Sequence, residues 1–278
     1  MNRQGNALLA YSASTGGNAR AKALTPERRA EIARKAASAR HLPRVAHQYK
    51  MRERAALLNP RPPLPSLDGC TVRAIQAAQA RPIILKYEWL GTMGRAAACY
   101  GLFSPTNELL GVSCFGWPSS PESRDVCGEE NRPLAVCLER GACVHWAPRN
   151  AASFLIRRAV GLAHAEHGWA IFYAYADPSA GEIGAIYQAL NWYYIGQGVG
   201  REPGRTRDRF VRPDGRVVSD RALTHAGVTI RDLPLGWRRV QVAPKHKYVF
   251  FEGAEADALL ALCRYPFQPY PKRKGGAA

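Results

Sequence analysis

Acidic residues are scarce in this 278-residue chain: 22 Asp and Glu stand against 39 Lys and Arg, a formal net charge of +17. Solubility alone does not require so much positive charge, which favours a polyanionic partner, either nucleic acid or an acidic membrane surface. A generic basic protein without such a partner is the alternative. Hydrophobic residues make up 46% of the chain, so a sizeable core can form in one large domain or a medium domain with appendages.

Several familiar patterns are missing. No apolar run approaches the roughly 18 residues that a membrane span needs, and the first residues, MNRQGNALLAYSASTGG, lack the apolar core of a signal peptide. The seven cysteines form no CxxC pair, which indicates reduced thiols rather than a disulfide framework or a zinc site. No G-x-G-x-x-G follows a strand and no Walker A sequence occurs, which excludes a doubly wound dinucleotide fold. We therefore expect a cytoplasmic protein.

The first 60 residues differ from the rest, with twelve Lys and Arg against three Asp and Glu. Thr25 and Pro26 are suited to the N-cap and first turn of a helix over residues 24–40. We interpret residues 1–60 as a basic arm, partly disordered or helical, that orders on DNA or against the main domain; a solvated tail is the alternative. The proline-rich NPRPPLPSL then marks a linker, and residues 61–278 form the main domain.

The pattern of apolar residues and turn signals predicts a mixed α/β fold, with a central sheet flanked by helices. A long polar loop is expected over residues 117–133. We expect helices over residues 70–80, 149–168 and 182–190, and strands over residues 85–91, 95–103, 108–117, 141–148, 169–177 and 191–196, with a last strand pair within 236–251.

The turn VHWAPRNAASFLIRR joins an expected strand to an expected helix. The start of a helix binds phosphate through unpaired N–H groups and the positive end of its dipole. Arg149, Asn150 and Ser153 are placed to contact a pyrophosphate. The segment resembles the acyl-CoA loop of the GNAT acetyltransferases, Q/R-x-x-G-x-G/A, with Ala152 and Phe154 in place of its glycines. An ordinary capped core helix is the alternative.

The stretch YADPSAGEIGAIYQALNWYYIG, residues 175–196, is the second candidate site. Asp177 ends an expected strand and Tyr187 lies in the helix after it, so both are placed at the carboxyl edge of the sheet, where open α/β sheets bind ligands. A tyrosine hydroxyl there can act as a general acid or a hydrogen-bond donor. Asn191 and Trp192 are suited to pair with and stack on an extruded base. Packed core aromatics are the alternative.

This stretch is similar to the signature Y-A-D-P…G-x-x-G-x-I-Y-Q-A-x-N-W of the Mom family of phage proteins. The later KHKYVFF and YPFQPYPK are similar to that family's C-terminal motifs, and RNAASFLIRRA fits its middle section, so that the resemblance covers roughly residues 80–273. It implies a GNAT-like fold and the conversion of adenine N6 in DNA to a carbamoylmethyl form, which shields phage DNA from restriction. A phage or prophage gene expressed in the bacterial cytoplasm would follow.

The resemblance assigns roles to particular residues. Asp177 would be the catalytic base or the group that orients it, and Tyr187 the acid or a donor that positions the substrate. Tyr87 and Trp192 would hold the adenine, which must be flipped out of a duplex. Acetyl-CoA or a related acyl-CoA is the expected cofactor.

The resemblance also implies a metal, because iron has been suggested for the family. Lys86 stands where we expect a histidine before Tyr87, and a protonated lysine is a poor metal ligand. Glu88 would compensate only by facing the same side, and neighbouring residues of a strand face opposite sides.

Basic residues elsewhere complete the expected DNA contacts. His246, with Lys245 and Lys247 on either side, would bind a DNA phosphate. The arginine-rich residues 200–216 and the arm would bind further phosphates. We interpret the scattered histidines, His145 among them, as structural. Two alternatives remain: a GNAT enzyme that acetylates a small amine or a protein, and a DNA-binding GNAT relative without catalysis.

Overall fold

The structure is a computed structural model that describes residues 25, 27, 47–117, 121–198, 207–213, 217–219, 223, 227–229 and 231–272. The chain divides into two units, Met1–Arg44 and Val45–Ala278. The expected helix over residues 24–40 lies outside the described residues except for Thr25 and Glu27. The expected arm of residues 1–60 spans the division, and its last part belongs to the second unit.

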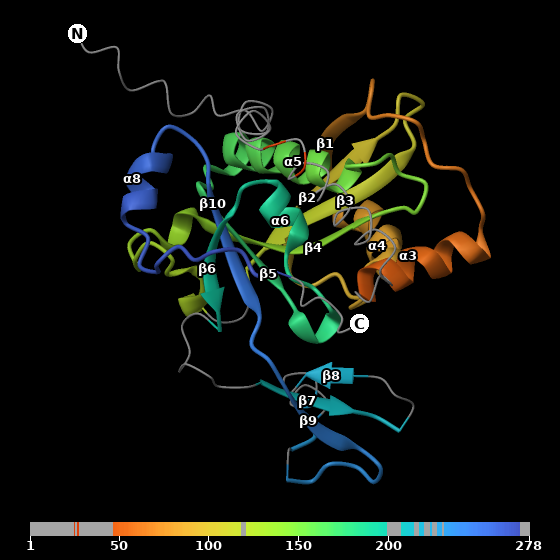
Figure 1. The fold of residues 1–278 in the computed structure, drawn as a ribbon, viewed down its shortest axis with the longest axis vertical. Coiled ribbons are helices and arrows are strands. Elements are labelled where there is room, and N and C mark those ends of the chain that lie inside the picture. Colours follow the sequence, from red (N-terminus) through yellow and green to blue (C-terminus); the bar gives the residue numbers. More distant parts are fainter. Residues whose placement is uncertain are drawn as a thin grey trace. The chain divides into compact units, whose positions relative to one another are not determined.

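A seven-stranded sheet forms the centre of the second unit, in the order β1-β2-β3-β4-β5-β10-β6 (Figure 1). Neighbouring strands are antiparallel except for β4 and β5, which are parallel. The strands are β1 (Thr71–Ile75), β2 (Ala96–Phe103), β3 (Leu109–Gly116), β4 (Ala135–Cys143), β5 (Ile171–Ala176), β6 (Tyr193–Gln197) and β10 (His246–Phe251). The expected mixed α/β sheet is therefore confirmed.

The parallel pair β4 and β5 is joined over only part of its length. Pairing runs from Ala135 opposite Ile171 to Leu138 opposite Ala174, and β4 then continues to Cys143 alongside β3. The two strands thus part towards their carboxyl ends, which is the edge where α/β sheets place their ligands.

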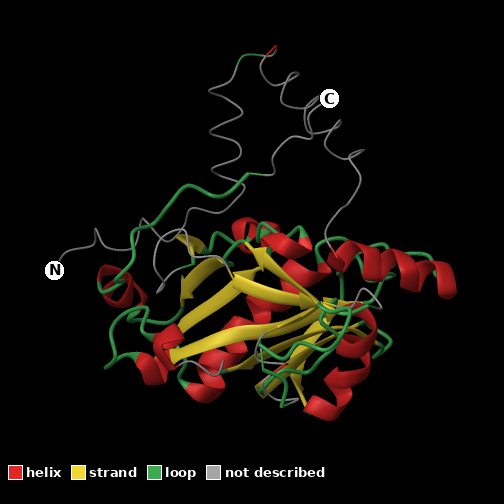
Figure 2. Ribbon diagram, turned by 90° about the horizontal axis from the view of Figure 1, so that it is seen from below, coloured by secondary structure: helices red, strands yellow, loops and turns green. Residues whose placement is uncertain are grey.

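Helices lie on both sides of the strand layer (Figure 2). α4 and α5 pack on β2, β3 and β4, while α3 packs on α4 and α8 on β10. The helices are α3 (His47–Leu58), α4 (Ala77–Tyr87), α5 (Ala151–His167), α6 (Ala185–Ala189) and α8 (Ala256–Ala261), with the short 3₁₀ helices η1 (Pro121–Arg124), η2 (Arg132–Leu134) and η3 (Pro178–Ala180). In the part of the chain that the structure describes, no helix is long and apolar enough to span a membrane.

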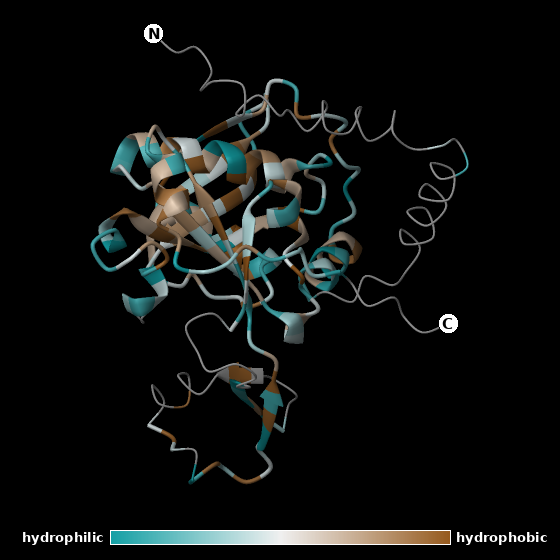
Figure 3. Ribbon diagram, turned by 60° about the vertical axis from the view of Figure 1, so that its left-hand side comes forward, coloured by the Kyte–Doolittle hydropathy of each residue, from teal (hydrophilic) through white to brown (hydrophobic). Residues whose placement is uncertain are grey.

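Alternate residues of the central strands face two hydrophobic clusters. In β5, Phe172 and Ala174 join the cluster that contains α5, whereas Ile171 and Tyr173 join the cluster against α8. Both sides of β5 are buried, as expected for a strand within a parallel pair covered on two faces. The brown colouring of the strands in Figure 3 reflects this continuous apolar character.

A second sheet, in the order β8-β7-β9, is inserted in the chain between β6 and β10. Its strands are β7 (Arg207–Val211), β8 (Val217–Ser219) and β9 (Arg238–Val242). The segment 236–251 does contain two strands, as expected, but they do not pair: β9 belongs to the small sheet and β10 lies between β5 and β6.

Three expected elements are wrong. The helix over residues 70–80 is replaced by β1, which pairs with β2, followed by α4. Thr71, Val72 and Ile75 are β-branched, and pairing with β2 outweighs the helix preference of the alanines between and after them. The strand over residues 85–91 is instead the end of α4 and its following turn, and β4 ends at Cys143 rather than beginning near Gly141.

The remaining long elements agree with the sequence patterns. The strands over 95–103, 108–117, 169–177 and 191–196 correspond to β2, β3, β5 and β6, and the helices over 149–168 and 182–190 correspond to α5 and a shorter α6. The polar loop over 117–133 contains η1 and leads into η2, apart from residues 118–120, which lie outside the described residues.

The motif segments noted in the sequence pack against one another. The Gln188 amide donates to the Ile183 carbonyl (2.8 Å), the Tyr248 hydroxyl (3.0 Å) and the Pro271 carbonyl (3.3 Å). Tyr270 donates to the Trp192 carbonyl at 3.0 Å. The residues 175–196, β10 and the C-terminal segment therefore form one interlocked unit.

Gly184 sits where only glycine fits this unit. Its φ is +72°, and a Cβ atom built there would lie 2.3 Å from the Tyr248 ring. We predict that Gly184→Ala destabilises the fold by the left-handed backbone cost, about 1–2 kcal/mol, plus an overpacking cost of about 1–3 kcal/mol. Urea denaturation of the purified protein measures the change in the free energy of unfolding.

Gly168 is the matched control. It ends α5 with a similar φ of +70°, but a Cβ atom there meets nothing within 4 Å. Gly168→Ala should therefore show the backbone cost alone. Equal destabilisation by the two substitutions would contradict the role of the Tyr248 contact.

Candidate active site

Residues 177–184 form a compact loop at the carboxyl end of β5. Asp177 caps η3 by accepting from the Ser179 N–H (3.0 Å) and the Ser179 hydroxyl (2.6 Å). The Glu182 carboxylate turns back to accept from the Asp177 N–H at 3.1 Å. The proline after Asp177 suits the first turn of such a helix, because it lacks an N–H that would otherwise be unpaired.

Asp177 is the centre of a buried cluster of charges. Only 2% of it is exposed, and its two oxygens lie 2.9 Å from Arg207 Nη2, 3.4 Å from Arg209 Nη2 and 4.0 Å from Lys245 Nζ. Burial would raise its pKa, but the Ser179 hydrogen bonds and the charges of Arg207 and Lys245 outweigh this, so the pKa lies below its ordinary value. Asp177 thus joins the small sheet to the edge of the large one as a fully engaged carboxylate.

Tyr187 lies half-buried between two other aromatic rings, with Trp192 and Tyr248 each 5.3 Å away between ring centroids. Within the described residues, its hydroxyl makes no hydrogen bond. Burial, together with the nearby charge of Glu182, raises the pKa of this hydroxyl, so it remains a proton donor at neutral pH. An unpartnered hydroxyl next to the end of β5 is available to a ligand.

Two carboxyl groups accompany Tyr187. Glu88, which is 6% exposed, accepts from the N–H groups of Leu90 (2.8 Å) and Gly91 (3.1 Å). Burial raises the pKa of Glu88 to about 7, against the opposing charge of Arg140. Burial also raises the pKa of Glu182. The charge of either carboxyl raises the pKa of Tyr187, and we refer to the three groups together as the Glu88–Glu182–Tyr187 cluster.

Tyr87 does not join this cluster. Its ring is 2% exposed, and its hydroxyl lies 3.4 Å from His145 Nδ1, with the Trp146 ring at 6.3 Å. Glu88 is the C-cap of α4 with extended backbone, so the two neighbouring side chains diverge where the helix ends. The two side chains were expected to face opposite sides of a strand; they do diverge, but the cause is the end of α4 and not strand alternation.

Lys86, in the position where the resemblance implies a histidine, is exposed on α4 and lies 5.5 Å from the centroid of the Tyr87 ring. Across the described parts of the chain, no three His, Cys, Asp or Glu side chains gather closely enough to hold a metal ion. We therefore assign no residue to iron.

The start of α5 retains the features expected of an anion site. Arg149 and Asn150 are exposed, and Asn150 takes a left-handed backbone (φ 64°) that turns the chain into the helix. The Ser153 hydroxyl donates to the Asn150 carbonyl at 2.9 Å. Within the described residues, the N–H groups of Ala152 and Ser153 find no backbone acceptor. These residues could hold a pyrophosphate, and they are separate in sequence from the cluster around Tyr187.

The expected substrate contacts divide into exposed and buried groups. Asn191 is exposed, with a left-handed φ of 58°. Trp192 is only 2% exposed and stacks on Phe250, so it is a core side chain and offers no face to a base.

The basic segment of β10 divides in the same way. The side chain of Lys245 is 32% exposed beside Asp177. His246 is buried, bonded to the Tyr194 hydroxyl at 2.9 Å, and burial lowers its pKa. Lys247 is 2% exposed and donates to the Ser123 carbonyl at 2.7 Å, so of the three residues only Lys245 can reach a phosphate.

Sequence reasoning missed Glu88 and Glu182 as site residues, and it did not foresee that Arg207 and Arg209 pair with Asp177. A signal for Glu88 existed: Ile83, Ile84 and Tyr87 recur at helical spacing, which places the next residue at a helix end. The arginine pairing has no local signal, because 30 residues separate Asp177 from Arg207.

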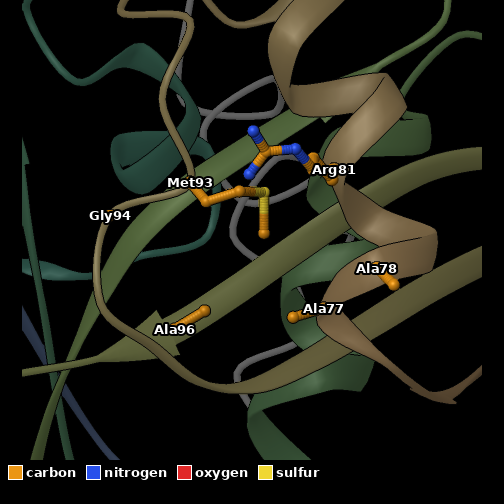
Figure 4. Close-up of a pocket in the computed structure, with 6 residues that line it drawn as sticks. All are labelled: Ala77, Ala78, Arg81, Met93, Gly94 and Ala96. Carbon is orange, nitrogen blue, oxygen red and sulfur yellow. The ribbon is translucent and has the colours of Figure 1, made fainter.

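A surface hollow of about 310 Å³ lies between the start of α4 and the chain before β2 (Figure 4). Arg81 and Met93 point towards each other across it, and Arg81 is the only charged residue among those that line it. Without further converging polar groups, the hollow has no ligand that we can name.

Solved structures of acetyltransferases resemble the chain in part, and no curated protein matches it in sequence. An IAA acetyltransferase from Bacillus cereus is 12% identical, over 66% of this chain and 99% of that one, with a TM-score of 0.38. An N-acetyltransferase from Staphylococcus aureus is 11% identical over 66% and 98%, with a TM-score of 0.36. A ribosomal-protein-S5-alanine acetyltransferase from Vibrio fischeri is 6% identical over 68% and 96%, with a TM-score of 0.38.

The family comparison is more specific. The model of the Mom protein family matches residues 69–272, which is nearly three quarters of the chain. This range contains β1 to β10, both motif segments that interlock with β10, and the whole Glu88–Glu182–Tyr187 cluster. The chain therefore belongs to the Mom protein family.

Proposed function

We propose that this protein is a DNA-modification transferase that converts adenine N6 to a carbamoylmethyl form and so protects DNA from restriction. One observation carries the proposal: the signature of the family folds into a site where an unpartnered tyrosine hydroxyl and two carboxyls lie next to a basic cluster. Tyr187 and Glu182 belong to the signature, and Arg207, Arg209 and Lys245 surround its Asp177.

The chemistry requires a base and a positioned donor. The lone pair of the adenine N6 amine is delocalised into the ring, so the amine reacts only when it is held against an activated carbon and loses a proton as the N–C bond forms. The donor's leaving group departs with its electron pair. The neutral Tyr187 hydroxyl can donate a hydrogen bond to that leaving group or to the base, because burial keeps it protonated.

Asp177 holds the neighbouring basic side chains in place and does not transfer a proton in this proposal. Its pKa is lowered and its oxygens are occupied by Ser179, Arg207 and Arg209, so it is a weak base. It fixes the basic side chains at the carboxyl end of β5, where their positive charge can attract the DNA phosphates to the site. A flipped adenine would then be held by Asn191, the exposed amide at the end of α6.

The start of α5 fits an acyl-CoA cofactor. Arg149 is exposed, the N–H groups of Ala152 and Ser153 lack acceptors within the described residues, and the small side chain of Ala152 allows a close approach. These groups would hold the pyrophosphate of the cofactor. Asn150 sets the turn that exposes them. The alanine in place of glycine leaves the anion-binding N–H groups intact.

The nucleosides of cellular DNA test the function directly. We predict that expression of the full chain in a bacterium produces a new adenosine species, whose mass exceeds that of deoxyadenosine by one carbamoylmethyl group less the hydrogen that it replaces. Mass spectrometry of digested DNA measures it. An acetylated amine or protein, with unmodified DNA, would instead identify an ordinary acetyltransferase, and tight DNA binding with neither product would identify a non-catalytic relative.

The Tyr187 hydroxyl can be removed without removing an internal hydrogen bond. We predict that Tyr187→Phe leaves the melting temperature within about 2 °C of the wild type, because the ring contacts remain and no hydrogen bond within the described residues is lost. The yield of modified adenosine should fall by about 10–1,000-fold if the hydroxyl assists the reaction. Full activity of this variant would remove Tyr187 from the mechanism.

The DNA-binding role of the arm has its own test. Residues 1–44 carry nine Lys and Arg and two Glu, and they stop before α3, whose Arg52 donates to the Val144 and His145 carbonyls of the second unit. We predict that deleting residues 1–44 makes the dependence of DNA affinity on salt shallower, since each lost phosphate contact lowers the slope by about 0.9. Binding of duplex DNA at several salt concentrations measures this slope, and an unchanged slope would show that the arm makes no contact.

A further inference from the structure

Glu88 is a buried carboxylate whose position is fixed by its own turn. It caps α4, with its N–H bonded to the Ile84 carbonyl at 3.0 Å, and its Oε2 accepts from Leu90 and Gly91. Among the described residues, no basic group lies within ion-pair distance and Oε1 has no hydrogen-bond partner. One oxygen is therefore anchored while the other remains available.

The groups that face Glu88 come from three other elements. Arg140 of β4 favours its charged form, and the guanidinium of Arg140 is itself held by the Thr92 carbonyl (2.6 Å) and hydroxyl (3.0 Å). Glu182 from the loop after η3 disfavours the charged form. Tyr187 of α6 lies close enough for the charge of Glu88 to raise its pKa. Only 6% of Glu88 is exposed, so its side chain is directed to the interior with these groups and not to the outer surface of α4.

The other carboxyls near Tyr187 are engaged in hydrogen bonds or ion pairs and are poorly suited to act as the base. Asp177 is occupied by Ser179 and two arginines, and Glu182 is bonded both to the Asp177 N–H and to the Trp89 side chain. A general base must offer a free lone pair within hydrogen-bond reach of the proton that it removes. Among the carboxyls around Tyr187, Glu88 has one oxygen without a partner in the described residues.

We propose that Glu88 is the catalytic base that accepts the proton of adenine N6, with Asp177 as the anchor of the basic side chains. This inference rests on the proposed function. The N6 lone pair forms the new N–C bond to the methylene carbon of a carbamoylmethyl donor of the alkylating class, in which that carbon carries a leaving group, and the bond to the leaving group breaks with its electron pair on the leaving group. One N6 proton passes to Glu88 Oε1.

The acidity of Glu88 suits this role. Burial raises its pKa to about 7, and a base is most effective when its pKa lies near the working pH. Below pH 7 the carboxyl of Glu88 is protonated and cannot accept a proton, and above pH 7 it is ionised and can. The rate of modification should rise as the pH increases through about 7.

Glu88→Gln is the test, because the amide oxygen can still accept from Leu90 and Gly91. Purified full-length protein is given duplex DNA and the small-molecule fraction of a bacterial extract as the source of the donor, and modified adenosine is quantified by mass spectrometry from pH 5.5 to 8.5. We expect the rate to fall by about 10²–10⁴-fold, with loss of the rise near pH 7. DNA affinity and melting temperature should match the wild type.

Two further variants complete the test. Glu255→Gln, an exposed residue before α8, should keep the wild-type rate and pH profile. Glu88→Asp keeps a carboxylate on a shorter side chain, so we expect a reduced rate of modification that still rises with pH. Where Glu88→Gln fails to fold, this variant tests whether Glu88 is the base. A folded Glu88→Gln variant with the wild-type profile would overturn the inference about Glu88. Absence of any adenosine adduct with the wild-type protein would instead overturn the proposed function.

Discussion

The ion pairs of Asp177 are the interaction on which the arrangement of this site depends. A carboxylate that is 2% exposed persists only where positive charge and hydrogen bonds compensate for its lost hydration, and here Arg207, Arg209, Lys245 and Ser179 supply both. These partners come from β7, from the chain before β10 and from η3. One buried charge therefore fixes the end of β5, the following loop and the inserted sheet together.

This engagement also determines which groups remain reactive. The pKa of Asp177 is lowered by its partners, whereas burial raises the pKa values of Glu88 and Glu182 a short distance away. Neighbouring acids whose pKa values are shifted in opposite directions commonly divide structural and acid–base roles in enzymes. The same division is the physical basis for assigning anchoring to Asp177 and proton transfer to the Glu88–Glu182–Tyr187 cluster.

The sequence predicts those parts of the structure that rest on local patterns. The β-rich runs of β2, β3 and β5 and the periodic helix α5 follow from residue spacing alone, as does the turn at Asp177. The end of α4 does not, because strand pairing of β1 shifts the helix along the chain, so that Glu88 caps a helix instead of lying in a strand. Pairing between Asp177 and Arg207, 30 residues apart, depends on tertiary structure that no local pattern records.

The stretch over residues 175–196 looked divided between packed core and active site, and the structure explains why both descriptions apply. Trp192 and Gln188 are committed to packing and to hydrogen bonds with β10 and the C-terminal segment. Tyr187 shares that aromatic packing through its ring but leaves its hydroxyl without a partner in the described residues. An unpaired hydroxyl lowers the stability of the fold only if it is buried away from water and finds no other hydrogen-bond partner. The Tyr187 hydroxyl is not among the buried atoms that lack a partner, so it can bond water in the free protein and exchange that water for a substrate or donor under the proposed function.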